Sequence, residues 1–371
     1  MKVKLGDVCE RGSSNLKQSD VVGMSGDYPI YGAAGYLGNV DFYHQEKPYV
    51  AVVKDGAGIG RTTLHPAKSS VIGTMQYLLP KSNILPEYLY YVVSYKHLEK
   101  YFTGATIPHI YFKDYKNEKF NLDSLDMQKK IVDILSKCEG IIKSRNKELE
   151  LLDELVKARF VEMFGDPVIN EKEWVTKPLL DMGICKNGMN FHYNDCGVEI
   201  NCLGVGDFKN LSVIDNTEQL STVLLNEMPS EEYLLKDDDI VFVRSNGNKA
   251  LVGRSVAVYP GDIPITFSGF CIRYRKQDDA VTIPYLLRVL KTDSIRRKMA
   301  GRGANIQNLN QQILGNLIIP VPPIELQNQF SDFVKRIDKS KVSLYYKNRK
   351  DGFPPLLFIY SVTTIINLSD Y

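Results

Sequence analysis

The sequence lacks the residue groupings on which most metal sites and catalytic centres depend. Its five histidines stand apart, and none forms the His-x-x-x-His pair of a zinc site. The six cysteines contain no Cys-x-x-Cys pair, which favours reduced, buried thiols over a disulfide framework. The Asn/Asp-Pro-Pro-Tyr/Phe motif of amino-methylating enzymes is absent, and the glycine-rich stretch 56–60 follows no nucleotide-binding pattern, so we expect a hairpin or a strand-edge turn there. We therefore expect neither catalysis nor a bound metal or cofactor in this chain.

Long apolar runs and an excess of one charge are also missing. No stretch of about eighteen apolar residues occurs, and the N-terminus lacks an apolar core, so we expect no membrane span and no signal peptide. These features favour a cytoplasmic protein. The net charge is only +2, so a nucleic-acid binder of this composition must concentrate its basic residues locally. The 371 residues exceed what one core usually supports, which predicts two or more domains.

The strongest positive pattern runs from Ser124 to Phe164. Apolar residues recur at steps of three and four, with charged residues between them and one interruption at Arg145. This heptad pattern predicts a helix roughly 60 Å long, ended by Gly165 and Pro167. Because such a helix cannot bury its own apolar stripe, it requires a partner. Its predicted coiled-coil residues are Ile131, Leu135, Cys138, Ile142, Leu149, Leu152 and Val156.

The chain also repeats itself. A strand at 49–54, a glycine loop, a strand at 75–79, a helix from Pro86 towards Tyr101 and a loop at 104–109 precede the long helix. The same order recurs as strands at 239–244 and 269–274, a helix from Ile283 to about Met299, a loop at 303–307 and a second amphipathic helix. Gln128 and Gln327, near the starts of the two long helices, stand 199 residues apart. The partner positions on the second helix are Phe330, Val334 and Ile337.

This duplication predicts an α+β chain with pseudo-two-fold symmetry. Two mixed α/β domains would be joined by long helices that form an antiparallel coiled coil. The expected parts are a first domain at 1–123, a central helix at 124–165, a second domain at 166–323, a short distal helix at 324–350 and an atypical tail at 351–371.

Basic side chains gather at the strand ends and in the loops of both halves, more weakly in the first half, and the second half adds amide side chains. Residues 285–302 hold six basic residues and one acidic residue, and an amide-rich loop follows them. Arg and Lys neutralise phosphates, whereas amides and Arg can read base edges, although a solvated helix face explains the same stretch without any ligand. The candidate DNA-binding residues are Lys54, Arg61, His109, Lys113, Arg244, Asn246, Lys249, Arg254, Arg296, Arg297, Arg302, Asn305 and Gln307.

Several motifs resemble those of one family. They are the turn at 28–32, the paired loops at 104–106 and 303–305, the segment 319–322 with Gln327, and the segment 159–166. Their order and doubling resemble the specificity subunit of type I restriction–modification systems. The resemblance implies two target-recognition domains that read an asymmetric, split sequence in double-stranded DNA. It further implies docking of two modification subunits and of restriction subunits that translocate DNA, with S-adenosylmethionine, ATP and Mg²⁺ bound on those partners.

Two other functions stay open: a self-contained DNA methyltransferase or nuclease, and a coiled-coil scaffold without a DNA function. The final segment departs from the family pattern, because the heptads fade after Leu344 and an apolar run begins at Leu356. This departure indicates a truncated or rearranged end. We therefore expect the long apolar stripe to lack its intramolecular partner from about Leu149 onward.

Overall fold

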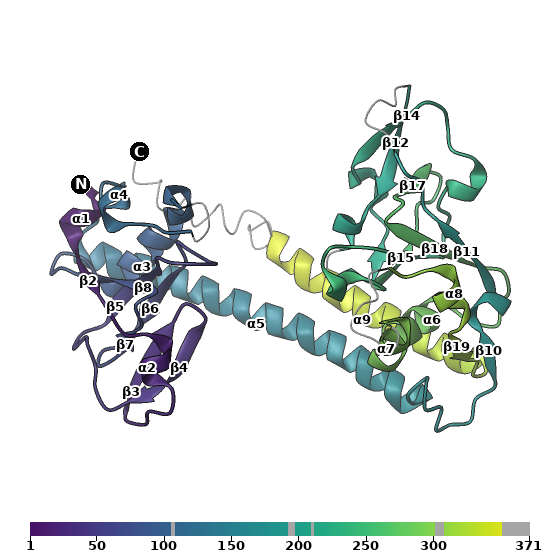
Figure 1. The fold of residues 1–371 in the computed structure, drawn as a ribbon, viewed down its shortest axis with the longest axis horizontal. Coiled ribbons are helices and arrows are strands. Elements are labelled where there is room, and N and C mark those ends of the chain that lie inside the picture. Colours follow the sequence, from purple (N-terminus) through teal and green to yellow (C-terminus); the bar gives the residue numbers. More distant parts are fainter. Residues whose placement is uncertain (105–107, 192–196, 209–210, 301–307, 351–371) are drawn as a thin grey trace. The chain divides into compact units, whose positions relative to one another are not determined.

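The computed structural model describes residues 1–104, 108–191, 197–208, 211–300 and 308–350. They form two compact units: unit 1 is built mainly from Met1–Lys147, and unit 2 from Glu148–Leu344. The division falls inside the long helix α5 (Leu125–Phe164), so each unit contains part of it. The mixture of helices and sheets in each unit confirms the predicted fold class (Figure 1).

Unit 1 is built on a four-stranded antiparallel sheet in the order β2-β8-β5-β6. A hairpin of β3 and β4 joins β7 in a second sheet, and β1 pairs with β9. The strands are β1 (Lys2–Lys4), β2 (Cys9–Ser13), β3 (Tyr28–Gly32), β4 (Gly35–Val40), β5 (Tyr49–Val53), β6 (Thr62–His65), β7 (Ser70–Val71), β8 (Met75–Pro80) and β9 (Lys119–Asn121). The helices are α1 (Leu5–Val8), α2 (Gln18–Val21), α3 (Pro86–Tyr95), the 3-10 helix η1 (Leu98–Tyr101) and α4 (Phe112–Tyr115).

Unit 2 repeats this plan with a five-stranded sheet in the order β11-β18-β15-β16-β13 and a three-stranded sheet β14-β12-β17. Its strands are β10 (Thr176–Pro178), β11 (Gly183–Asn187), β12 (Val198–Leu203), β13 (Val213–Ile214), β14 (Thr222–Leu225), β15 (Asp239–Val243), β16 (Ser255–Val258), β17 (Ile265–Phe267), β18 (Cys271–Lys276) and β19 (Ile318–Pro320). Its α-helices are α6 (Ile283–Leu290), α7 (Asp293–Ala300), α8 (Gln311–Gly315) and α9 (Ile324–Lys350). Short 3-10 helices are η2 (Leu179–Asp181), η3 (Val205–Asp207), η4 (Thr217–Gln219), η5 (Glu231–Tyr233) and η6 (Lys249–Leu251).

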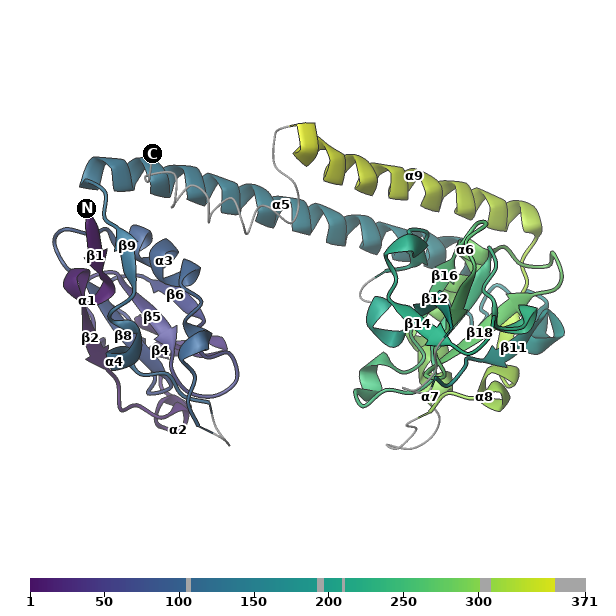
Figure 2. The same ribbon diagram turned by 90° about the horizontal axis from the view of Figure 1, so that it is seen from above.

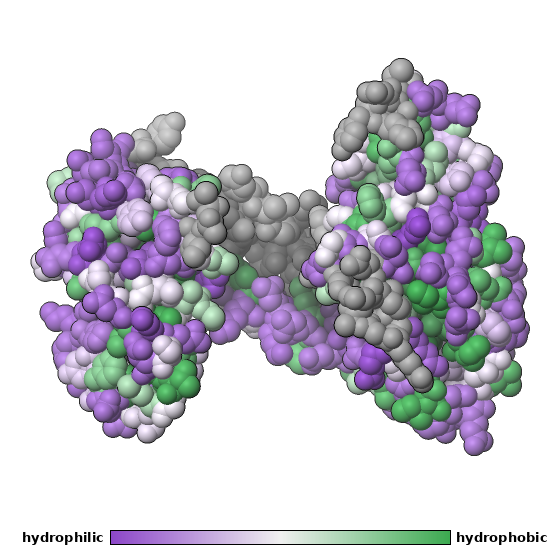
Figure 3. Space-filling view, viewed as in Figure 1, coloured by the Kyte–Doolittle hydropathy of each residue, from purple (hydrophilic) through white to green (hydrophobic). Residues whose placement is uncertain are grey.

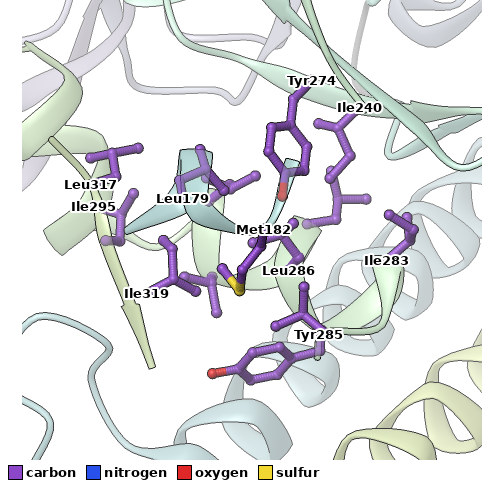
Figure 4. Packing of buried hydrophobic residues seen from close by; sticks show 14 of the residues in the cluster. Leu179, Met182, Ile240, Tyr274, Ile283, Tyr285, Leu286, Ile295, Leu317 and Ile319 are labelled. Atoms are coloured by element: carbon purple, nitrogen blue, oxygen red, sulfur yellow. The ribbon is translucent and has the colours of Figure 1, made fainter. Parts of the chain in front are cut away.

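The main core of unit 2 lies between its larger sheet and its helices. Figure 4 shows Tyr274 and Ile240 of the sheet facing Met182, Leu286 and other apolar side chains from α6 and the neighbouring segments. These residues are fully or almost fully buried. Because each buried side chain of this size contributes roughly 1.5–3 kcal/mol, this cluster fixes the position of α6 on the sheet.

Two buried glutamines show the duplication in atomic detail. Gln128 accepts a hydrogen bond from the Leu85 amide (2.9 Å), and its side-chain amide donates to the Asn83 carbonyl (3.0 Å). Gln327 accepts from the Thr282 amide (2.9 Å) and donates to the Ala280 carbonyl (3.0 Å). Each glutamine therefore joins the start of a long helix to the start of the shorter helix that packs beside it. The predicted internal duplication is confirmed.

Within unit 2, α9 lies antiparallel to the final turns of α5 in both views (Figures 1 and 2). The Phe160 ring lies 5.6 Å from that of Phe330, and Lys341 Nζ lies 2.6 Å from Asp153 Oδ1. The expectation that the stripe lacks a partner from about Leu149 onward was wrong. In an antiparallel pair, the start of the second helix meets the end of the first, so a short α9 still covers these turns.

The predicted coiled-coil positions have different surroundings in the two units. In unit 1, Ile131 packs against the core of the same unit, Leu135 is 2% exposed, Cys138 is half-buried, and Ile142 is 38% exposed. In unit 2, Leu149 and Leu152 are half-buried, and both helices contribute to one core. Heptad positions of the two helices that lie in or against that core include Val156, Phe160, Phe330 and Val334. Ile337 is 9% exposed.

Two helices are shorter than predicted. The helix from Ile283 ends at Leu290, and α7 begins only at Asp293. The Thr292 hydroxyl donates to the Val289 carbonyl (2.7 Å), which satisfies an acceptor at the end of α6. In unit 1, α3 ends at Tyr95, because His97 has a left-handed backbone (φ 50°) that a right-handed helix does not accommodate.

The five cysteines within the described residues are free thiols, and Cys196 lies outside them. The predicted loop at 303–307 and the tail at 351–371 also lie outside the described residues. No helix of the described chain is both long and apolar enough to cross a membrane.

Candidate nucleic-acid interface

The hairpin between β5 and β6 carries two of the predicted residues of unit 1. The Gly60 amide donates to the Val53 carbonyl (2.9 Å) and closes the expected turn. Lys54 follows β5, and its Nζ lies 3.8 Å from Asp55 Oδ2. Arg61 is exposed, and its guanidinium donates to the Ala33 carbonyl (3.0 Å). These contacts hold two cations at one end of the sheet.

The segment around His109 lies against this hairpin. The Ile110 amide donates to the Lys54 carbonyl (2.9 Å), and His109 Nδ1 lies 2.7 Å from Asp55 Oδ1. The ring of Tyr111 stacks on that of His109 with centroids 6.4 Å apart, and Lys113 Nζ lies 5.4 Å from the Tyr111 centroid. The structure thus brings Lys54, His109 and Lys113 into one polar surface.

Unit 2 builds the same framework from other side chains. The Gly253 amide donates to the Val243 carbonyl (2.8 Å), and the Leu309 amide donates to the Arg244 carbonyl (2.7 Å). Arg244 therefore occupies the position that Lys54 has in unit 1. Its guanidinium donates to the Gly269 carbonyl (3.2 Å) and is half-buried.

The loop between β15 and β16 is stabilised by a local turn and by a contact with α7. Asn246 Oδ1 accepts from the Asn248 amide (2.8 Å), which stabilises a local turn. Arg296 reaches this loop from α7 and donates to the Ala250 carbonyl (3.3 Å). Burial, followed by the nearby charge of Arg254, lowers the pKa of Arg296. Three predicted residues, Arg254, Arg296 and Asn246, therefore belong to one loop cluster.

Other predicted residues lie elsewhere or cannot be placed. Arg297 is exposed, and its charge contributes to lowering the pKa of Asp166, just after α5, so it lies on another side of α7. Arg302, Asn305 and Gln307 lie outside the described residues, as does the side chain of Lys249.

The basic stretch 285–302 is not one continuous helix face. Because α6 and α7 are separate helices, its cations point into different surroundings. Arg288 is partly buried, and its Nε has no hydrogen-bond partner among the described residues. Lys291 donates to Ser212 Oγ (2.7 Å), and burial together with the charge of Arg288 lowers its pKa to about 8. Both side chains are therefore half-buried rather than free on the surface of the unit.

Sequence patterns did not identify Asp55 and Tyr111. Asp55 joins Lys54 to His109, and Tyr111, which is 50% exposed, lies between His109 and Lys113. Both are sequence neighbours of predicted residues, and that adjacency was the available signal. The described part of the chain contains no group of three His, Cys, Asp or Glu side chains able to hold a metal ion.

Two repeated α/β units, each presenting cations from equivalent strand-end loops and unit 2 adding side-chain amides, define a duplicated protein with one candidate binding surface in each unit. A family model described as the type I restriction modification DNA specificity domain matches residues 1–151 and 171–350. The chain belongs to this family, whose members are the non-catalytic DNA-recognition subunits of type I restriction–modification systems.

Two relatives from Methanocaldococcus jannaschii are similar to this chain. The type I restriction enzyme MjaVIII specificity subunit is 24% identical over 311 residues, which is 78% of this chain and 72% of the relative. The MjaIX specificity subunit is 23% identical over 308 residues, covering 76% and 70%. The solved S subunit from M. genitalium covers 99% of this chain and 94% of its own, with 16% identity and a TM-score of 0.58. That structural likeness supports the shared fold.

Proposed function

We propose that this chain reads a bipartite and asymmetric sequence in double-stranded DNA, one half-site with each unit. The observation that carries the proposal is a common framework with different side chains. Lys54 and Arg244 make equivalent backbone hydrogen bonds, whereas the loops beside them differ in sequence. Equivalent positions would contact the two half-sites in similar ways, and different side chains would read different bases.

The helix α5 would set the number of unread base pairs between the half-sites. It runs without interruption from unit 1 into unit 2, with the division between them at Lys147 and Glu148. Two readers at a fixed separation require half-sites at a fixed spacing. Insertion of seven residues after Lys147 would lengthen the helix by about 10 Å. We expect the unread spacer to change while both half-sites stay the same, and altered half-sites would contradict this role.

Exposed apolar side chains on α5 would dock the modification subunits. In unit 1 these are Ile134 and Ile141, which are 49% and 57% exposed; in unit 2 they are Leu151 and Leu155, at 50% and 47%. Figure 3 shows apolar side chains among hydrophilic ones along the visible part of α5. Exposed apolar positions at helical spacing suit an amphipathic helix from another protein. The partners would carry S-adenosylmethionine, ATP and Mg²⁺, and restriction subunits would join the same assembly.

Selection from a randomised duplex pool tests this function. The full chain, in complex with its modification subunit, would be used to enrich bound DNA. We expect two conserved blocks separated by an unread spacer. Changing Arg244→Ala should weaken enrichment of one block only, whereas Lys335→Ala, an exposed position on α9, provides a matched control that removes one cation. An unselective pool from the wild-type complex would contradict the proposal.

A further inference from the structure

Phe270 is an exposed aromatic residue at the edge of the loop cluster in unit 2. It lies just before β18 and is 62% exposed. The other large hydrophobic residues exposed in the described part of unit 2 are aliphatic. A single exposed ring needs no ligand to explain it, so the case for a ligand rests on the support and the neighbours of Phe270.

The backbone around Phe270 is fixed from several sides. Its carbonyl accepts from the amides of Arg244 (2.8 Å) and Ser245 (3.2 Å). The Cys271 amide donates to the Ser268 carbonyl (2.8 Å) and closes a turn with Phe270 inside it. The ring therefore projects from a rigid support, and less entropy would be lost when it binds a partner.

The neighbours of Phe270 suit a nucleic acid. Arg244, whose guanidinium is bonded to the Gly269 carbonyl, is the closest cation along this backbone network. Asn246 follows two residues later, and Asn190 lies against Gly269. A cation, amides and an exposed ring together provide phosphate contact, base-edge hydrogen bonds and stacking.

The corresponding residue of unit 1 is Thr74. The Lys54 amide donates to the Thr74 carbonyl (3.0 Å), as the Arg244 amide does to Phe270, and Gly73 precedes Thr74 as Gly269 precedes Phe270. Thr74 is half-buried and has no ring to present. The same framework position thus carries a ring in only one of the two units.

We propose that Phe270 is a specificity-determining DNA contact that inserts its ring between adjacent base pairs of the half-site read by unit 2. This inference rests on the function proposed above. An apolar ring that enters the stack must partly unstack one step, and pyrimidine–purine steps such as TA and CA unstack most easily. The half-site of unit 2 therefore contains such a step at a fixed place, and its selection depends on Phe270.

The test uses the full chain with its modification subunit and the duplex selected by the wild-type complex. The fluorescent base 2-aminopurine is placed at successive positions in each half-site, because its emission rises when a neighbouring base unstacks. The wild-type complex should raise the emission at one step in the half-site of unit 2. Phe270→Ala should abolish that rise and weaken binding by about 5- to 150-fold, whereas Phe270→Trp should retain both. Ile169→Ala, which removes a side chain that is 74% exposed in the same unit, should behave like wild type.

The outcomes separate the two proposals. A wild-type complex without any sequence preference contradicts the proposed function itself. A selective wild-type complex, together with a Phe270→Ala variant of equal affinity and equal emission, contradicts the role of Phe270 alone. Loss of modification-subunit binding in Phe270→Ala, with DNA selection intact, would assign the ring to a protein contact and overturn the inference. Thermal unfolding should be unchanged in each variant, since the ring is exposed.

Discussion

Replacement of Gln327 by alanine should destabilise unit 2 strongly. The side chain is fully buried and makes three hydrogen bonds: it accepts from Thr282 and donates to the carbonyls of Ala280 and Pro322. Alanine leaves three backbone groups without this partner, and each orphaned buried group costs about 1–3 kcal/mol. Two of these bonds are only partly buried, so water recovers some of the loss. The expected total is about 3–5 kcal/mol.

Thermal unfolding and hydrogen exchange measure this effect. For a unit of this size, about 3–5 kcal/mol corresponds to a Tm lower by roughly 6–20 °C. Amides at the starts of α6 and α9 should lose protection first, whereas unit 1 should keep its protection. Gln329→Ala is the matched control, because Gln329 is exposed on the same helix. A Tm within 2 °C of wild type, or equal loss of protection in both units, would refute the reasoning.

Three further variants test stability. Burial lowers the pKa of His65 to about 4, so stability should be complete above pH 6.5 and fall by about 3 kcal/mol as the pH drops towards 4; His65→Gln should remove this slope in urea unfolding. Burial raises the pKa of Asp166, but hydrogen bonds from backbone amides lower it by more, so its net pKa lies below the ordinary 3.8. Asp166→Ala should therefore lower the free energy of unfolding by about 1–2 kcal/mol at pH 7 and by less near pH 2. Asp239 is fully buried in a bidentate pair with Arg275 (2.8 and 2.7 Å), so Asp239→Ala should cost about 3 kcal/mol in the same assay, and an unchanged midpoint would contradict this.

The fold was predictable where the sequence repeats a simple physical pattern. Heptad spacing identified α5, and the recurrence of Gln128 as Gln327 indicated two copies of one unit. Each pattern has a simple physical cause: an apolar helix stripe has to be covered, and a buried side-chain amide needs the same hydrogen-bond partners in each copy. The break between α6 and α7 was missed, because no proline or glycine marks it; at the break, both the hydroxyl and the amide of Thr292 donate to the Val289 carbonyl.

The candidate site was predictable only in part. Lys54 and Arg244 could be identified, since each follows a strongly apolar strand and precedes a polar loop. Asp55 and Phe270 could not, because their positions depend on hydrogen bonds between segments far apart in the sequence. Side-chain type does not reveal how exposed a cation is: Lys291 and Arg297 belong to the same basic stretch, but Lys291 is half-buried and bonded to Ser212, whereas Arg297 is exposed.

Methylome sequencing tests the central claim most directly. A host that carries this chain with its modification subunits is compared with the same host lacking only this chain. The account predicts one methylated motif of two unlike blocks separated by a fixed unread spacer, present only in the first host. Methylation that is independent of the chain, or that follows a single continuous motif, would contradict the account.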